Sequence, residues 1–216
     1  MTDPELLALG FLFNQRIIKE KREVKSVDFD EELNVVVVRT VDETPYEVNS
    51  KKKIRTSGCA LGTVFGNLMD EIDEIKLSPR EIKVSILYDL ARKINTTPSL
   101  YLETGAIHGT VLCDYSGPLV YMEDVGRHNA VDKISGWMLN NDVGGEDKIL
   151  YTTGRLTSEM VIKAAIMGIP ILLSRSGFTA WGVEIAKSVG LTMVGRLRGE
   201  RFLCLTGSKN LIFDEK

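Results

Sequence analysis

The second half of the chain alternates between short apolar runs and segments of helical periodicity, and this alternation constrains the fold more than any other feature. From about residue 106, the strand-like runs are GTVLCD, PLVYME, KILYTT, IPILLSRS and LTMVGRLRG, and the helix-like segments are RHNAVDKISGWML, TSEMVIKAAIMG and TAWGVEIAKSVG. Continuous apolar strands that alternate with helices form a largely parallel sheet covered on both faces. We therefore predict an α/β fold: a three-layer α/β/α arrangement around a mixed sheet.

The first part of the chain has a different pattern. The segment DPELLALGFLFNQRIIKEK has helical spacing, with Asp3 as N-cap and Pro4 at the first helical position, and NVVVVRT from Asn34 reads as a strand. Further along, SPREIKVSILYDLARKI predicts a helix that begins at Pro79. We predict a small N-terminal helix and β-rich portion over residues 1–60, followed by an α/β/α cofactor-binding domain over residues 61–216.

Composition excludes several classes of protein. The chain has 216 residues, a net charge of −3, three widely spaced cysteines and two histidines. It has no apolar run long enough to span a membrane and no basic excess for bulk nucleic-acid binding. The cysteine spacing favours a reducing compartment and does not provide a zinc site. We expect a cytoplasmic protein with no metal site, no membrane and no nucleic-acid partner.

Polar residues collect directly after the predicted strands. Ligands of open α/β sheets bind outside the carboxyl ends of the strands, so these segments are expected to meet at one crevice. Arginine forks and helix N-termini together favour a polyanion, such as a nucleotide or a phosphorylated cofactor. Alternatively, each arginine is a surface or salt-bridged residue. The segments are residues 123–129, 154–159, 175–177 and 196–201.

The segment EDVGRHNAVDK also has a structural interpretation. Its charged residues can form an internal ion-pair network that fixes a strand-to-helix turn, with Asp124 as the cap and His128 bonded to the framework. The members of that network would be Glu123, Asp124, Arg127 and Asp132.

Cys59 differs from the other two cysteines. It lies between Gly58 and Ala60, after a basic run, whereas Cys113 and Cys204 fall within apolar strands. A positive neighbourhood lowers the pKa of a thiol, and the thiolate is the form that attacks sulfur or carbonyl centres. Cys59 is therefore the candidate reactive thiol.

At this point the segments LLALGFLFNQRII, RTSGC, TGAIHGTVLCD, EDVGRHNAVDK, TGRLTSEMVIKAAIMGIPILLSRS and GLTMVGRLRGERF resemble, in this order, the FdhD family of formate dehydrogenase accessory sulfurtransferases. The resemblance implies a cytidine-deaminase-like fold and a homodimer. It also implies transfer of persulfide sulfur from a cysteine desulfurase to the molybdenum cofactor, in its bis(molybdopterin guanine dinucleotide) form, before insertion into formate dehydrogenase.

The resemblance places the persulfide on Cys59 and cofactor binding on the stretch Arg196, Leu197, Arg198, Gly199, Glu200, Arg201 and Phe202. We add the polar residues that border the predicted crevice as further candidates for binding this cargo or a GDP-like nucleotide. They are His108, Arg127, His128, Gly154, Arg155, Ser158, Arg175 and Ser176.

This chain departs from the family pattern at the CxxC motif. The family has a CxxC pair where this sequence reads Cys59-Ala60-Leu61-Gly62, so the second thiol is missing. One thiolate can carry a persulfide, but it cannot relay sulfur to a neighbour within the loop. The alternative is a non-catalytic chaperone that binds the cofactor or a guanine nucleotide. A third hypothesis is a nucleotide-modifying enzyme with His108 or His128 as general base, although His108 can equally be structural.

Overall fold

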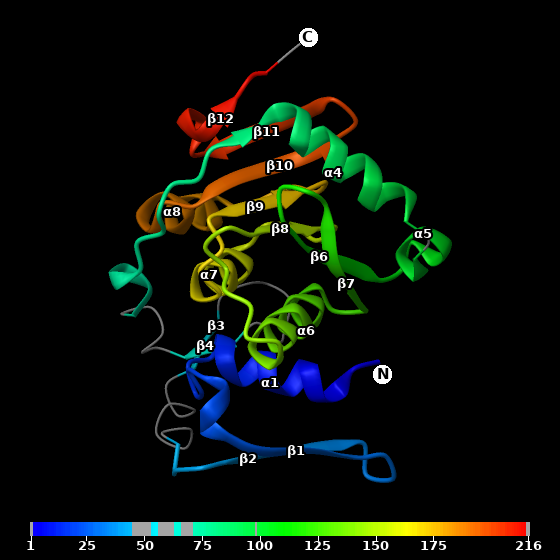
Figure 1. The fold of residues 1–216 in the computed structure, drawn as a ribbon, viewed down its shortest axis with the longest axis vertical. Helices are drawn as coiled ribbons and strands as arrows, with labels where there is room; N and C mark the ends of the chain where they lie inside the picture. Colours follow the sequence, from blue (N-terminus) through cyan, green and yellow to red (C-terminus); the bar gives the residue numbers. More distant parts are fainter. Residues whose placement is uncertain (1, 45–52, 56–62, 66–70, 98, 215–216) are drawn as a thin grey trace.

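The computed structural model describes residues 2–44, 53–55, 63–65, 71–97 and 99–214. Its centre is a six-stranded sheet with the strand order β11-β10-β9-β8-β6-β7 (Figure 1). Strands β8, β9 and β10 run parallel, and the other neighbouring pairs are antiparallel. The strands are β6 (His108–Cys113), β7 (Pro118–Asp124), β8 (Ile149–Thr152), β9 (Ile171–Ser174), β10 (Thr192–Arg198) and β11 (Arg201–Thr206).

Helices cover both faces of this sheet, which confirms the predicted three-layer arrangement. Leu150 and Leu172 belong to the core under α6 (Arg127–Asn140), α7 (Ser158–Ile166) and α8 (Ala180–Val189). Their strand neighbours, Ile149 and Ile171, belong to a second core under α4 (Val84–Thr96). Every residue of β8 and β9 is buried, which explains why these strands are continuously apolar up to their last residues, Thr152 and Ser174, rather than alternating.

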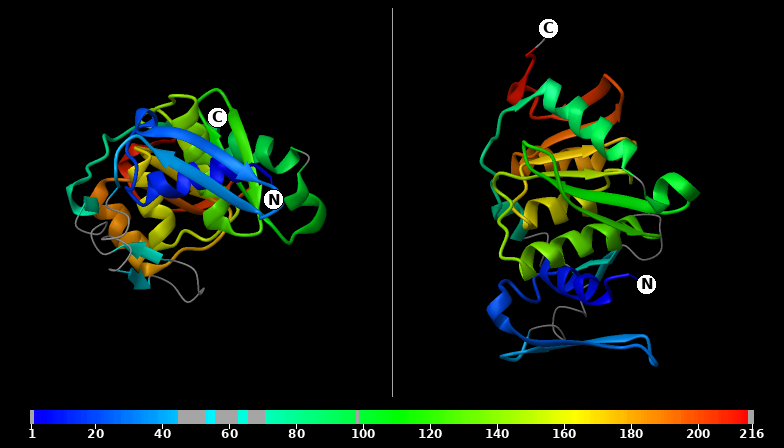
Figure 2. Two further views of the ribbon diagram at one scale, coloured as in Figure 1. Left: turned by 90° about the horizontal axis from the view of Figure 1, so that it is seen from below. Right: turned by 45° about the vertical axis from the view of Figure 1, so that its right-hand side comes forward.

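The N-terminal segment adds another layer on the α6 side. Helix α1 (Pro4–Asn14) packs against α6, and the hairpin of β1 (Val24–Asp30) and β2 (Val35–Thr40) lies beyond α1 (Figure 2). A 3-10 turn, η1 (Lys21–Glu23), precedes the hairpin, and β3 (Lys53–Arg55) pairs with β4 (Thr63–Phe65). The predicted boundary at residue 60 lies outside the described residues and stays a prediction.

The start of α4 corrects one expectation. The helix begins at Val84, not at Pro79, because Ile82 and Lys83 form β5 (Ile82–Lys83) and pair in parallel with β12 (Leu211–Ile212). Ile82 is buried, so packing against the C-terminal segment outweighs the local helix signal. By contrast, α1 begins at Pro4 as predicted, although Asp3 makes no side-chain capping bond.

The remaining short elements are α5 (Leu100–Thr104), after α4, and η2 (Ser208–Asn210), before β12. Among the residues that the structure describes, no helix has the length and apolar character needed to cross a membrane. The same residues contain no cluster of three or more histidine, cysteine, aspartate or glutamate side chains suited to a metal ion.

Candidate functional site

The polar segments after the strands lie along one edge of the sheet, and the single crevice between them stays a prediction. His108 pairs with Asp124 across β6 and β7, and Thr152 pairs with Ser174 across β8 and β9. Because β6 is antiparallel to β8, the start of β6 lies at the carboxyl end of β8. Hydrogen bonds connect the loops: the Ser174 hydroxyl donates to the Gly154 carbonyl at 2.7 Å, and the Arg196 N–H donates to the Ser176 carbonyl at 2.9 Å.

Asp124 fixes the turn between β7 and α6. Its carboxylate accepts bonds from the Gly126 N–H and the Asn129 amide, each at 3.0 Å, and pairs with the Lys133 ammonium at 2.8 Å. Burial opposes ionisation of Asp124, but these contacts outweigh burial and lower the pKa of the carboxyl below its usual value. Asp124 therefore acts structurally, as the ion-pair interpretation expected.

Arg127 does not join that ion-pair network. Asp132 pairs with Lys163 at 2.7 Å, and Arg127 has no ion pair with any described residue. The Arg127 side chain is only 9% exposed, and its Nε and Nη2 atoms are buried without a hydrogen-bond partner. The structural interpretation thus holds for Asp124 as a member of an ion pair that fixes the turn. It is wrong for Asp124 as the helix cap, because the N-cap of α6 is Gly126 without a side-chain capping bond, and it is wrong for Asp132, which pairs outside the segment, and for Arg127.

Two histidines accompany Arg127. His108 Nδ1 lies 3.3 Å from the Thr153 hydroxyl, which also accepts the Gly109 N–H. Burial, followed by the nearby charges of Arg127 and His128, lowers the pKa of His108. These interactions place His108, Arg127 and His128 in one electrostatic neighbourhood.

His128 faces the start of α7. Its Nε2 is 3.5 Å from a carboxylate oxygen of Glu159, which is buried and accepts the Thr157 hydroxyl at 2.9 Å. The other candidate on this helix, Ser158, is the first residue of α7 and is also buried. The start of α7 therefore forms a second buried polar junction at this edge of the sheet.

A second group of polar residues lies on the α4 side of the sheet. The Arg175 guanidinium donates to the Asn95 side chain at 3.2 Å and lies 5.4 Å from the centre of the Tyr101 ring. Arg198 Nε donates to the Arg175 carbonyl at 3.3 Å. Ser176 is half-buried and donates its N–H to Ser174, and Arg155 is exposed. Of the predicted arginines, Arg175 is therefore already held by protein contacts.

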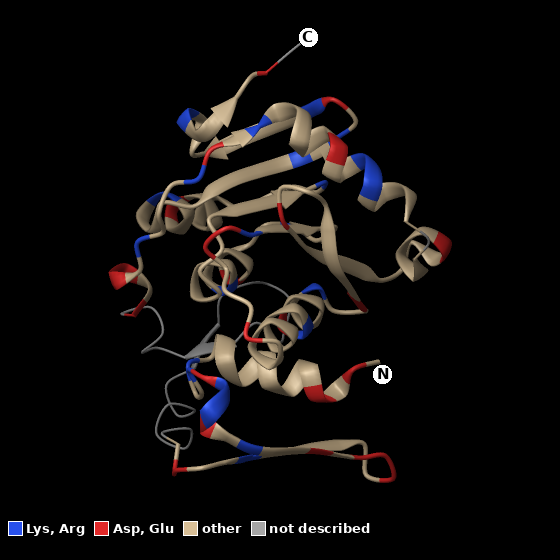
Figure 3. Ribbon diagram, viewed as in Figure 1, with Lys and Arg blue, Asp and Glu red and all other residues tan. Residues whose placement is uncertain are grey.

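The stretch Arg196–Phe202 forms the end of the β10–β11 hairpin (Figure 3). Leu197 is fully buried in the α4-side core, and the Phe202 ring packs 6.0 Å from the Tyr88 ring. These two side chains support the hairpin rather than forming its surface. The exposed members of the stretch are Arg196, Arg198, Gly199, Glu200 and Arg201.

The thiols differ in accessibility. Cys59 lies outside the described residues, so its reactive role stays a prediction. Cys113 is buried, and burial raises the pKa of its thiol to about 12, with a smaller contribution from Asp114. Burial also raises the pKa of the half-buried Cys204. Both described thiols are thus held in the protonated, weakly nucleophilic form.

Sequence reasoning missed several residues at this edge. Thr153 precedes Gly154 in the segment TTGR, and Glu159 follows Ser158. Because each is the sequence neighbour of a candidate residue, both could have been predicted to lie at this edge. Asn95 and Tyr101 come from α4 and α5, 80 and 74 residues before Arg175, and no local pattern connects them.

Comparison with known proteins gives a consistent result. A family model described as the FdhD/NarQ family matches residues 1–212. A protein named sulfur carrier protein FdhD from Wolinella succinogenes is 32% identical over 209 residues, which cover 96% of this chain and 73% of that relative. A protein of the same name from Sulfurisphaera tokodaii is 34% identical over 209 residues, covering 95% of this chain and 79% of that one.

The fold is also similar to a solved structure. The crystal structure of a formate dehydrogenase accessory protein from Desulfotalea psychrophila aligns with a TM-score of 0.78 at 30% identity. The alignment covers 98% of this chain and 80% of that protein. The similarity therefore extends over the central sheet and its helices as well as the N-terminal portion.

Proposed function

This chain belongs to the FdhD/NarQ family, and from that membership we propose that it is a sulfur carrier that serves a formate dehydrogenase. In this proposal, Cys59 takes sulfur as a persulfide from a cysteine desulfurase in the cytoplasm. The protein, as a homodimer, then passes the sulfur to the molybdenum bis(molybdopterin guanine dinucleotide) cofactor. That cofactor is the cargo of the reaction rather than a resident group.

The observation that carries the proposal is the state of the two described thiols. A carrier cysteine must be a thiolate that reaches a partner protein, and burial raises the pKa of both Cys113 and Cys204. Cys59, after the basic run, is the thiol that remains. Loading is an exchange: the Cys59 thiolate attacks the terminal sulfur of the donor persulfide. A new S–S bond forms at Cys59 while the old one breaks, and the donor leaves as its thiolate.

The exposed polar groups of the sheet edge support cargo binding. Arg155, Arg196, Arg198 and Arg201 are exposed at this edge or at the adjoining hairpin, and α6 and α7 begin there. Guanidinium groups and helix N-termini are suited to the diphosphates of a guanine dinucleotide. This donor set fits the proposed cargo and would also accept a GDP-like nucleotide.

The test is intact-protein mass spectrometry after incubation with a cysteine desulfurase and cysteine. We expect the natural chain to gain one sulfur that a thiol reductant removes, and Cys59→Ala to gain none. Cys204→Ala is the matched control, because it also removes a thiol but leaves Cys59 in place, and it should load normally. Sulfur that persists in Cys59→Ala would contradict the proposal.

The missing second thiol of the CxxC pair favours a second candidate function. Without it, the chain could act as a chaperone that binds the cofactor without covalent sulfur chemistry. In that case Cys59→Ala would leave formate dehydrogenase maturation unchanged, whereas Arg198→Ala would impair it through a lost phosphate contact. Maturation measured in parallel with sulfur loading separates the two functions.

A further inference from the structure

Arg127 combines near-complete burial with the absence of a counter-charge among the described residues. We propose that the start of α6 is a binding site for one phosphate-class oxyanion. In this site the Arg127 guanidinium is the bidentate anchor, and His108 and His128 flank it. The inference deepens the proposed function and rests on it for the natural ligand, because the cargo carries diphosphate groups.

The two unpartnered atoms of Arg127 identify the class of ligand. Nε and Nη2 lie on the same side of the guanidinium group and present two parallel N–H bonds. This pair matches two oxygens of one phosphate, whereas a single sulfur anion would occupy only one of the donors. The open fork thus favours an oxyanion over a sulfide.

The carboxylates around the start of α6 have partners other than Arg127: Glu159 faces His128 and accepts the Thr157 hydroxyl. Arg127 is the first residue of the 14-residue helix α6, where free backbone N–H groups and the helix dipole favour an anion. The nearby Asp124 is already bonded to Lys133, Gly126 and Asn129. The lowered pKa of His108 follows from burial and from the cationic neighbours Arg127 and His128. An added anion would therefore offset several unfavourable interactions at once.

Gly154 shapes the space beside the Arg127 side chain. A Cβ atom on Gly154 would lie 2.8 Å from the Arg127 Cβ and 3.0 Å from its Cδ, so the arginine stem runs directly over this glycine. Only a residue without a side chain allows this approach without a shift. Since Nε and Nη2 are covered from solvent in the free protein, ligand entry requires local movement around them.

A buried charge without a partner reduces the stability of the free protein. Replacing Arg127 with methionine keeps an apolar stem and removes the charge. We expect the Tm of ligand-free Arg127→Met to equal or exceed that of the natural chain, which is the opposite of the result for a structural arginine. The Tm rise caused by GDP should be lost in this variant.

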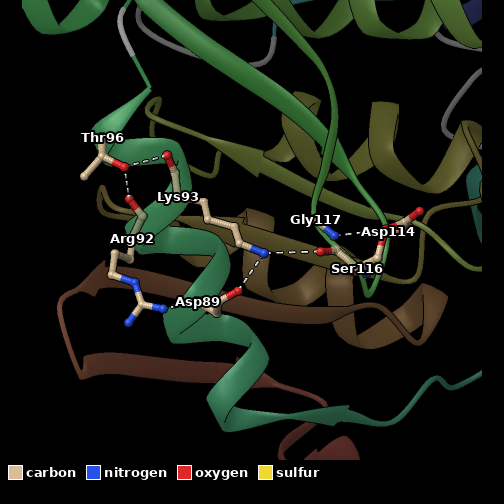
Figure 4. A network of polar contacts seen from close by, with 7 residues as sticks. All are labelled: Asp89, Arg92, Lys93, Thr96, Asp114, Ser116 and Gly117. Atoms are coloured by element: carbon tan, nitrogen blue, oxygen red, sulfur yellow. Dashed lines mark hydrogen bonds and ion pairs between the residues drawn. The ribbon is translucent and has the colours of Figure 1, made fainter.

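The experiment is thermal unfolding of the full chain in the presence of inorganic phosphate, GDP or guanosine. Arg127→Lys keeps the charge but not the fork, and we expect it to bind GDP about tenfold or more weakly. The control is Arg92→Lys, which changes an exposed arginine paired with Asp89 on α4 (Figure 4) and should respond to GDP as the natural chain does.

Comparing the three ligands distinguishes a site for free phosphate from a site for a nucleotide diphosphate. Stabilisation by inorganic phosphate alone assigns the site to free phosphate, and stabilisation by GDP but not by phosphate assigns it to the nucleotide diphosphate.

A guanosine effect equal to that of GDP overturns the proposal, as does an unchanged GDP response in Arg127→Met or Arg127→Lys. A Tm loss in ligand-free Arg127→Met also overturns it. Sulfur loading of Cys59, measured on the natural chain and on the Arg92→Lys control, tests the carrier function separately, so failure of this site and failure of the carrier function are separable.

Discussion

His108 shows how one residue at the sheet edge is adjusted by its surroundings. Its ring contacts the Thr153 hydroxyl, and burial together with Arg127 and His128 disfavours its protonated form. The folded chain therefore binds this proton more weakly than the unfolded chain does. Stability attributable to His108 is fully present above the ordinary pKa of 6.5 and is lost as the pH falls from there toward the lowered folded value.

The prediction concerns the pH dependence of Tm. Between about pH 7.5 and 5 the natural chain should lose stability, and His108→Asn should lose less, because Asn does not take up a proton in this range. The pKa values of Asp114 and Asp124 are lowered from 3.8, so these carboxylates act below this window. Parallel pH profiles for the two proteins, measured by thermal unfolding, would contradict the assignment.

At the scale of secondary-structure elements, α1 and α6 approach each other through two glycines. A Cβ on Gly136 would lie 2.0 Å from the Leu6 carbonyl oxygen, and a Cβ on Gly10 would lie 1.7 Å from the Asp132 carbonyl oxygen. Both obstacles are backbone atoms, which cannot move without separating the helices. Close packing of the N-terminal helix on the central domain thus depends on the absence of these side chains.

Gly136→Ala should therefore destabilise the protein by about 1–3 kcal/mol or more, even though alanine favours helices. Urea unfolding measures the change. Gly177→Ala is the matched control, since a Cβ at Gly177 would have no neighbouring atom within 4 Å and the change should be small. Equal stability of Gly136→Ala and the natural chain would show that the helices can separate at little cost.

The elements also show what the sequence could predict. Strands β8 and β9 and helices α6 to α8 follow from local periodicity, and the carboxyl ends of the strands place most of the candidate residues. The predicted start of α4 is wrong because β5 pairs with β12, about 130 residues away. The side chains of Leu197 and Arg175 could not be placed from the sequence either, since one faces the core and the other contacts Asn95 and Tyr101. Such contacts depend on tertiary packing, which leaves no local periodicity.

At the scale of the whole molecule, one buried polar chain connects three helices that lie in two layers. Asn14 of α1 donates to Asp132 of α6 at 2.7 Å, and Asp132 pairs with Lys163 of α7 at 2.7 Å. The Ser135 hydroxyl donates to the side-chain amide oxygen of Asn14 (Oδ1) at 3.3 Å. The Asp132 and Lys163 side chains are 3% and 9% exposed, so each requires the other for charge compensation. The N-terminal helix is thereby tied to the helices that begin at the candidate site.

The last prediction concerns this pair. Lys163→Met leaves the Asp132 carboxylate buried with only neutral partners and should cost about 3–5 kcal/mol of stability. Adding Asp132→Asn removes the stranded charge and keeps an oxygen for the Asn14 amide, so the double variant should regain much of the loss. A double-mutant cycle in urea measures this coupling. Additive effects would mean that the two charges act independently, and the ion pair would then not couple α6 to α7.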